Sequence, residues 1–362
     1  MLRKKPPGRL LSASAHAVER EYRVLAALAD TAVPVPRVLL LCEDATVLGT
    51  PFYVMVFVAG RIFSDPAIPG VDAAERRLLW TAALATLATL HATDVRAVGL
   101  QAFGKPGSFY ARQIRTLTAV SRAQAATLDA DSGRAVGPIP SFAANMQYFA
   151  DTLTLVDDAA AAAAAADADA PGPVLIHGDY KIDNLVFHPT EPRVVGVLDW
   201  ELSTLGHPLS DLCNLLSPYV LGSGFGPPAD EAKSPDSGSV SGPGSDSDLA
   251  SVAAAVAVFT GTPGVPTRDE AVRIYQQAAA TGAGRWAGSM GVKLDWGLAF
   301  MLCRNSVITQ GISARHARRQ ASSAHAATYR ALTPRLAALA TRLVQADRGR
   351  RQQQLGGSPW KL

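Results

Sequence analysis

Apolar residues recur at helical spacing near the start of the chain. Within residues 15–30 they fall on one face of a helix: Val18, Tyr22, Leu25, Leu28 and Ala29. A stripe with this period predicts an amphipathic helix. Residues 36–44 and 51–60 are rich in Val, Leu and Phe and are bounded by Pro or Gly, which is typical of strands. We therefore expect a small lobe of strands and one helix over residues 1–63.

The pattern becomes helical from about residue 72. Residues 72–94 predict one long amphipathic helix, and residues 141–169, which include a run of alanines, predict another. Three short strands are expected next, at residues 173–177, 184–188 and 193–200. A polar loop separates the first two strands, and the turn at 189–192 folds the second strand against the third.

One later segment has a very different composition. Residues 222–249 are mostly Gly, Ser, Pro and Asp, so we expect a disordered insertion there. Helical patterns resume at about residue 268. The predicted division of the chain is a first lobe at 1–63, a helical lobe at 64–346 that contains the insertion, and a flexible tail at 347–362.

Charge and cysteine content narrow the function classes. With 34 basic and 31 acidic residues the net charge is +3, so nucleic acid is not expected as the main partner. Cys42, Cys213 and Cys303 lie far apart, which favours a reducing compartment. No apolar run reaches the ~18 residues of a membrane span, and no signal peptide is visible. We expect a cytoplasmic protein; residues 360–362 are similar to the peroxisomal Ser-Lys-Leu address, with Trp in place of the small residue.

Polar residues gather around the three short strands. Asp179 opens the loop after the first strand, Asn184 ends that loop, and Asp199 follows the third strand. Because the turn folds the second strand against the third, Asn184 and Asp199 should lie side by side. An amide oxygen and a carboxylate are hard ligands suited to Mg²⁺, completed by phosphate oxygens and water. Capping of strands and turns alone does not account for all three residues at these spacings.

The same loop carries the remaining groups for phosphoryl transfer. Asp179 can accept the proton of an attacking hydroxyl, and Lys181 can reach a phosphate, although a solvated lysine is the alternative. In protein kinases the corresponding residues occur in the motif H-R-D-L-K-x-x-N, followed by D-F-G. Here the sequence reads HGDYKIDN followed by DWE, with the same spacing from Asp to Asn. The loop is therefore expected to hold a metal–nucleotide complex.

These motifs resemble the aminoglycoside phosphotransferase/choline kinase family, and within it the kinase-like domain fused to acyl-CoA dehydrogenases in animals. The resemblance rests on HGDYKIDN with its downstream DW, and on GTPFYVMVFVAGRIF and AHAVEREYRVL in the family's order. It covers nearly the whole chain except the insertion and the tail. It implies an α+β, protein-kinase-like two-lobe fold. It also implies an enzyme that uses ATP and Mg²⁺ to phosphorylate the hydroxyl of a small molecule.

A kinase-like lobe needs a cation on a strand, paired with a glutamate on the next helix. Glu21 lies on the apolar arc of the first helix, where an unpaired charge is costly. Alignment with the family's strand puts Arg3 at the cation position, ahead of Lys5 and Lys4. Arg3 and Lys5 would share one face of a strand, and Lys4 would not.

The resemblance also assigns the adenine side of the site. Phe57 and Val58 would form the hinge that meets the adenine ring through backbone groups. The fold requires a phosphate-covering hairpin before the cation strand, and the sequence begins at that strand. We therefore expect either a first lobe that lacks two strands or a gene whose true start lies upstream of this sequence.

The binding site for the acceptor is expected in the helical lobe. Arg304, Gln310 and Arg315 lie on predicted helices there, and in the resembled group the acceptor is a hydroxyacyl-CoA. Arg315, Arg318 and Arg319 would suit CoA phosphates, whereas an aminoglycoside or choline pocket calls for carboxylates. A solvated helical face is the alternative reading for each arginine.

Other polar residues are expected to support the loop. His177 should hold it by hydrogen bonding, and Asp211 resembles the family's loop-bracing aspartate. Glu201 either adds to the metal shell or is an exposed polar residue. His188 and His207 are expected to be structural.

Two further functions compete with the kinase hypothesis. A pseudokinase or nucleotide-binding module without turnover is favoured by the absent hairpin. A metallohydrolase that uses histidines of the 177–207 segment is disfavoured, because no H-x-H or H-E-x-x-H pair occurs there.

Overall fold

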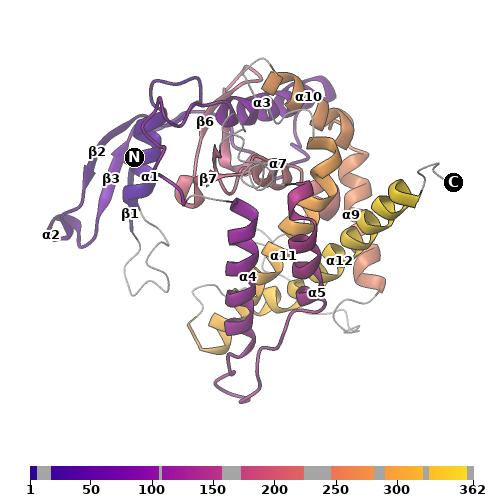
Figure 1. The fold of residues 1–362 in the computed structure, drawn as a ribbon. Coiled ribbons are helices and arrows are strands. Elements are labelled where there is room, and N and C mark those ends of the chain that lie inside the picture. The colour runs from indigo at the N-terminus through magenta and orange to yellow at the C-terminus, as the bar shows by residue number, and fades with distance from the viewer. Residues whose placement is uncertain are drawn as a thin grey trace. The chain divides into compact units, whose positions relative to one another are not determined.

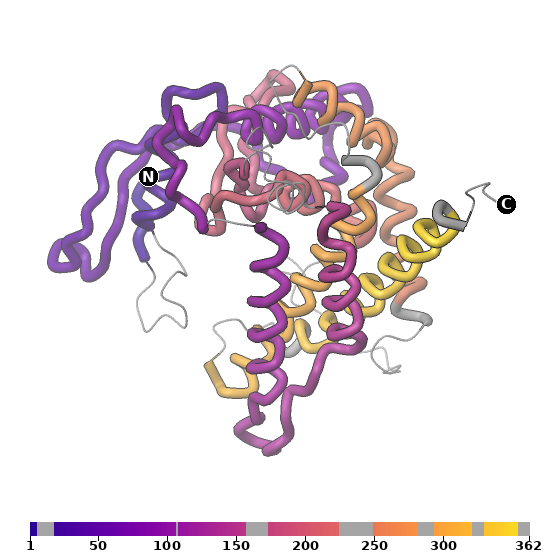
Figure 2. The backbone as a smooth tube through the Cα atoms, viewed as in Figure 1, coloured from indigo at the N-terminus to yellow at the C-terminus, as the bar shows by residue number. Residues whose placement is uncertain are grey.

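The computed structural model describes residues 1–5, 18–105, 108–156, 173–223, 246–280, 290–320 and 326–356. Figure 2 traces the backbone through them. The chain divides into two compact units. Unit 1 comprises residues 1–107, 171–216 and 259–291, and unit 2 comprises residues 108–170, 217–258 and 292–362.

Unit 1 begins with an antiparallel sheet in the order β1-β3-β2 (Figure 1). Its strands are β1 (Leu2–Lys4), β2 (Val38–Cys42) and β3 (Phe52–Met55). The short helix α2 (Ala45–Leu48) connects β2 to β3. Helix α1 (Val18–Leu28) packs against the sheet and buries the face that its sequence period predicts, with Glu21 among the buried residues.

Two antiparallel two-stranded sheets form the second part of unit 1. Strand β4 (Val174–Ile176) pairs with β7 (Thr204–Gly206). Between them in the chain, β5 (Leu185–Phe187) and β6 (Val194–Val197) pair as a hairpin. The expected pairing of the second and third short strands is confirmed. Strand β7 was not predicted, because three residues carry too little periodicity to be recognised. The 3-10 helices η2 (Ile182–Asn184) and η3 (Trp200–Leu202) lie next to the hairpin strands.

Three helices complete the described part of unit 1: α3 (Ala73–His91), α7 (Leu209–Leu215) and α10 (Arg268–Ala280). Asp72 caps α3 by accepting a hydrogen bond from the backbone N–H of Glu75. Helix α10 packs along α3 (Figure 1). Arg76, on α3, is buried and donates to the carbonyls of Ile68 and Pro263, among others, which ties the approach to α3 to the segment before α10.

The predicted boundary at residue 63 does not separate the two units. Backbone hydrogen bonds run both ways between Arg61 and Phe187, at 2.8 Å each, and Val197 donates to the carbonyl of Pro34 at 2.8 Å. A Cβ on Gly60 would lie 2.3 Å from the carbonyl oxygen of Phe187, so only glycine allows this approach. The three-stranded sheet and the two two-stranded sheets therefore belong to one compact unit.

Unit 2 is built from helices. They are α4 (Phe109–Ala125), α5 (Phe142–Asp151), η1 (Leu153–Leu155), α8 (Pro218–Leu221), most of α9 (Asp246–Thr260), most of α11 (Met290–Ala317) and α12 (Ala326–Gly356). An aromatic cluster fills its core: Trp296 stacks on Phe300 with ring centroids 5.4 Å apart, and Phe149 and Tyr110 meet both rings edge-on.

Three predicted boundaries differ from the structure. Helix α5 ends at Asp151, and the predicted alanine-rich continuation lies outside the described residues. Residues 246–249, expected in the insertion, begin α9, because Leu249 and Val252 bury their side chains. Residues 224–245 and 357–362 lie outside the described ranges. Helix α12 continues ten residues beyond the predicted start of the tail, to Gly356, where Arg350 pairs with Asp295 at 2.6 Å and Arg351 with Asp347 at 2.8 Å.

No helix among the described residues has both the length and the hydropathy that a bilayer crossing needs.

Candidate active site

The loop between β4 and β5 places Asp179 next to Asn184. The amide nitrogen of Asn184 donates to the backbone carbonyl of Asp179 at 2.8 Å and lies 3.3 Å from the carboxylate oxygen Oδ2 of the same residue. The backbone N–H of Leu198 donates to the carbonyl of Asn184 at 2.9 Å. Because the nitrogen of the Asn184 amide is held by the protein, its oxygen is the atom that remains for a cation.

Asp199 lies at the end of the same hairpin. The register pairs Leu185 with Val197, so Asn184 before β5 and Asp199 after β6 are neighbours in space, as predicted. Asp199 adopts a left-handed backbone conformation with φ 66°, which is uncommon for a residue with a side chain. Two buried side chains hold the backbone before it: His177 Nε2 donates to Leu198 O at 2.8 Å, and Trp200 Nε1 donates to Val197 O at 2.9 Å.

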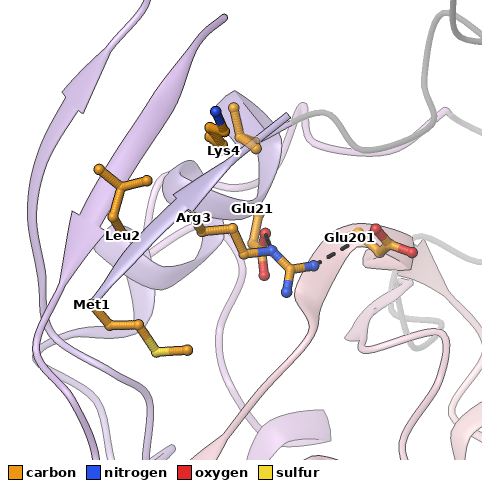
Figure 3. Close-up of a pocket in the computed structure, with 7 residues that line it drawn as sticks. Met1, Leu2, Arg3, Lys4, Glu21 and Glu201 are labelled. Carbon is orange, nitrogen blue, oxygen red and sulfur yellow. Dashed lines mark ion pairs between the residues drawn. The ribbon is translucent and has the colours of Figure 1, made fainter. Parts of the chain in front are cut away.

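Arg3 links the sheet to this hairpin. Its Nε lies 2.8 Å from Glu21 Oε2, and its Nη2 lies 2.6 Å from Asp199 Oδ1 and 3.7 Å from Glu201 Oε2. Figure 3 shows Arg3 reaching from β1 toward Glu21 and Glu201, while Lys4 projects away. The expected ion pair between Arg3 and Glu21 is therefore present. Arg3 therefore occupies the cation position that the strand alignment predicted. Lys4 points away, as the alternation of side chains along a strand requires.

The carboxylates around Arg3 have opposing electrostatic effects. Burial lowers the pKa of Arg3, but Glu21 and Asp199 outweigh it and raise the pKa above its ordinary value. Burial raises the pKa of Glu21 above its ordinary value, although Arg3 pulls it down. A pocket of about 400 Å³ opens beside this cluster. It is lined by Met1, Leu2, Arg3, Lys4, Val18, Glu21 and Glu201.

Lys181 lies between two loop carboxylates. Its Nζ is 3.1 Å from Asp183 Oδ2 and 3.5 Å from Asp179 Oδ2. Burial lowers the pKa of Lys181, but the two aspartates outweigh it and raise the pKa above its ordinary value. The ammonium is therefore fully charged at neutral pH and lies next to the candidate base.

Asp211, on α7, holds the backbone of the loop between β4 and β5. Its carboxylate is fully buried and accepts hydrogen bonds from the backbone N–H of His177 at 2.6 Å and of Gly178 at 2.8 Å. Gly178 has φ 89°, and a Cβ there would lie 2.5 Å from the carbonyl oxygen of Leu202. Burial raises the pKa of Asp211, but its hydrogen bond with His91 and the charge interactions with His91 and His177 hold the pKa below its ordinary value.

His91 is a residue of this cluster that the sequence motifs did not single out. This residue ends α3 and is buried, with Nε2 3.3 Å from Asp211 Oδ2 and Nδ1 2.7 Å from the hydroxyl of Tyr275 on α10. A signal was available, because His91 follows a long apolar stretch of its helix. A histidine on a buried helix face needs polar partners.

The remaining candidates are less closely tied to this cluster. Phe57 and Val58 follow β3; Phe57 is 70% exposed, and the side chain of Val58 lies against Gly196. His188 accepts hydrogen bonds through Nδ1 from the backbone of Thr190 and Glu191, and His207 accepts one from the backbone of Leu209, which agrees with structural roles.

The three acceptor-side candidates lie on α11 in unit 2. Gln310 is buried, and its amide accepts from Ser121 at 3.0 Å and donates to the carbonyl of Gly137 at 2.9 Å. These contacts use both ends of the amide inside unit 2, so the structure gives Gln310 a role in packing rather than in contact with an acceptor. Arg304 is half-buried and Arg315 is exposed.

The donor set suits magnesium better than a transition metal. Within the described ranges, no group of three or more His, Cys, Asp or Glu side chains could hold a metal ion. Asn184 and Asp199 offer two hard oxygens, and Mg²⁺ is commonly held by one or two carboxylates together with phosphate oxygens and water. Asp199 already attracts a cationic group, the guanidinium of Arg3. The residues present therefore fit Mg²⁺ bound together with a nucleotide.

A strand cation paired with a helix glutamate, and an Asp-Asn-Asp set on a loop and hairpin, define the kinase-like phosphotransferases. The chain belongs to the phosphotransferase enzyme family, whose profile matches residues 1–244. Its fold is the α+β, kinase-like fold of the aminoglycoside phosphotransferases.

Curated relatives are considerably longer than this chain. It is 34% identical over 344 residues to acyl-CoA dehydrogenase family member 10 of Mus musculus. That alignment covers 94% of this chain and 27% of the mouse protein. It is 38% identical over 316 residues to acyl-CoA dehydrogenase family member 11 of Gallus gallus, which covers 87% of this chain and 34% of that protein. The chain thus spans about a quarter to a third of the length of these relatives.

Solved structures show the same fold. A Ralstonia eutropha protein, a candidate aminoglycoside phosphotransferase, matches with a TM-score of 0.67 and 31% identity, over 95% of this chain and 85% of that chain. An ethanolamine kinase of Plasmodium vivax matches with a TM-score of 0.55 over 96% of this chain and 76% of that chain. At 11% identity the second likeness concerns the fold alone.

Proposed function

We propose that this protein is an ATP-dependent phosphotransferase that moves the γ-phosphoryl group to the hydroxyl of a small molecule. The observation that supports the proposal is the contact between Asn184 and Asp179 in the loop before β5, with Asp199 following β6 of the same hairpin and pairing with Arg3. Phosphoryl transfer needs positioning and charge neutralisation more than covalent chemistry, and these side chains supply both.

Each residue of the site takes a separate role in this proposal. Asp179 accepts the proton of the acceptor hydroxyl, and Lys181 neutralises charge on the transferred group. Asn184 and Asp199 hold the magnesium ion, which supplies charge neutralisation at the phosphates when bound. Arg3, oriented by Glu21, contacts the phosphates, and Phe57 and Val58 meet the adenine through their backbone.

The proposed acceptor is a hydroxyacyl-CoA. Support comes from the relatives, which are named as acyl-CoA dehydrogenase family members, and from their 34% and 38% identity to this chain. Arg315, on α11, is an exposed cation in the part of the chain where an acceptor is expected. CoA carries phosphates that arginine binds well. We propose the cytosol as the compartment.

A second candidate is nucleotide binding without turnover. It is favoured by the 2.6 Å contact between Arg3 and Asp199, because a guanidinium there neutralises the carboxylate that the metal would use. A protein of this kind would bind Mg·ATP and release no ADP.

The test combines binding and turnover. Wild-type protein should show a higher melting temperature with Mg·ATP and should release ADP when a hydroxyacyl-CoA is added. Asp199→Asn should abolish turnover while the fold is retained, because an amide is a poorer magnesium ligand than a carboxylate. Full turnover in this variant would remove Asp199 from the metal site. A thermal shift without ADP release in the wild type would favour the second candidate.

A further inference from the structure

Three buried polar side chains form a continuous line behind the catalytic loop, and none of them takes part in the proposed chemistry. Tyr275 on α10, His91 on α3 and Asp211 on α7 are at most 2% exposed. The Tyr275 hydroxyl lies 2.7 Å from His91 Nδ1, and His91 Nε2 lies 3.3 Å from Asp211 Oδ2. All three helices belong to unit 1.

The hydrogen-bond directions in this line follow from its two ends. A carboxylate only accepts, so His91 Nε2 carries the proton that it donates to Asp211. The Tyr275 hydroxyl lies at the other ring nitrogen, Nδ1, where it can donate to a neutral ring or accept from a charged one. With either ring charge, this contact holds the imidazole in the orientation that points Nε2–H at Asp211. Removal of the Tyr275 hydroxyl takes away this second anchor of the ring.

The far side of Asp211 holds the catalytic loop. Its two oxygens accept from the backbone N–H of His177 and Gly178, at 2.6 and 2.8 Å, and the side chain of Asn214 donates to the carbonyl of Gly178 at 3.0 Å. Gly178 is in the left-handed region at φ 89°, which glycine adopts without strain, so these hydrogen bonds select the conformation of the turn. The residue after the turn is Asp179, and the orientation of the turn sets the position of its carboxylate.

We propose that His91 and Tyr275 are positioning residues for the catalytic loop. They fix the carboxylate of Asp211, which in turn fixes the backbone of residues 177–179. A buried carboxylate that loses one of its donors either takes up a proton or moves toward another donor. In both cases the hydrogen bonds that the carboxylate accepts from the two backbone N–H groups weaken. The contribution to turnover rests on the proposed phosphotransferase function, whereas the contribution to loop order does not.

The test uses the full chain and compares four variants. His91→Leu removes both polar contacts, and His91→Gln keeps an amide N–H at about the depth of Nε2. Tyr275→Phe removes only the hydroxyl. Leu87→Ala is the matched control, because Leu87 is a fully buried apolar residue one turn before His91 on the same helix, and its truncation destabilises the unit without removing a polar group of the line.

The first measurement is hydrogen exchange of the backbone amides of residues 177 and 178 in the ligand-free protein. We expect His91→Leu and Tyr275→Phe to speed this exchange by about tenfold or more, the factor for loss of a hydrogen bond to a charged group. His91→Gln should restore most of the protection. Leu87→Ala should change these two amides no more than other amides of unit 1. The inference is overturned if His91→Leu leaves the two amides as protected as in the wild type, or if His91→Gln exchanges as fast as His91→Leu.

The second measurement is turnover. His91→Leu and Tyr275→Phe should lower kcat while KM for Mg·ATP stays within about threefold, because the residues act on the position of Asp179 and not on nucleotide contacts. An equal loss of kcat in Leu87→Ala at matched stability would show that the effect is global and would overturn the inference. Faster exchange together with a wild type that releases no ADP would support the positioning role and contradict the proposed function.

Discussion

Asp179→Asn is the sharpest single test of the catalytic loop, because the local contacts predict a large loss of turnover and only a small loss of stability. Asp179 Oδ2 lies 3.3 Å from the amide nitrogen of Asn184 and 3.5 Å from Lys181 Nζ. An asparagine at this position can still accept from Asn184. Lys181 keeps its closer partner, Asp183, at 3.1 Å. The substitution therefore removes a basic oxygen and leaves most of the loop's contacts in place.

The magnitudes follow from this geometry. The side chains of Asp179 and Lys181 are 36% and 43% exposed, so their lost attraction should cost about 0–1 kcal/mol of folding free energy. Loss of a general base typically lowers turnover by about 10² or more, which corresponds to about 2.7 kcal/mol in the activation barrier. Affinity for Mg·ATP should stay within about threefold, because Asp179 is not a metal ligand in this proposal.

The matched control is Asp183→Asn, which changes a neighbouring carboxylate of similar exposure, 39%. It leaves Lys181 paired with Asp179 alone, so turnover should fall by less than about tenfold. Turnover is measured as ADP release with a hydroxyacyl-CoA acceptor, and binding is measured by titration calorimetry with Mg·ATP. If Asp183→Asn is the inactive variant, or if Asp179→Asn no longer binds nucleotide, the roles assigned within this loop are wrong.

Two further predictions concern the support of the site. Gly178→Ala should lower turnover by more than about tenfold, because the strain of a left-handed alanine, about 1–2 kcal/mol, adds to a contact of 2.5 Å between the new Cβ and Leu202 O. Gly49→Ala, at φ 78° with open space around it, should cost the strain alone. Equal unfolding free energies for the two variants would contradict this reasoning. Burial raises the pKa of Glu21 above 4.5, so the folded protein binds the extra proton, and the free energy of unfolding should fall as pH rises from 4.5 through the raised pKa. Urea unfolding should show this slope in the wild type, and Glu21→Gln should lose it.

Local patterns in the sequence determined much of the scaffold. The 3.6-residue period placed Glu21 on the buried face of α1, because side chains three and four residues apart share a helix face. The turn at 189–192 paired β5 with β6, which brought Asn184 beside Asp199. The spacing within HGDYKIDN identified Asp179 as the candidate base. Each of these features depends on residues that are near one another in the chain.

The tertiary structure alone decided which distant polar groups meet. Arg3 and Asp199 are far apart in sequence and lie 2.6 Å from each other, and no periodicity links them. The line from Tyr275 through His91 to Asp211 depends on how α10, α3 and α7 pack. The sequence therefore indicated a supporting role for Asp211 alone and gave no link to His91 or Tyr275. Gln310 shows the reverse case. The sequence offered it as a ligand for the acceptor, but burial forced its amide to find partners inside unit 2, because an unpaired polar group is costly away from water.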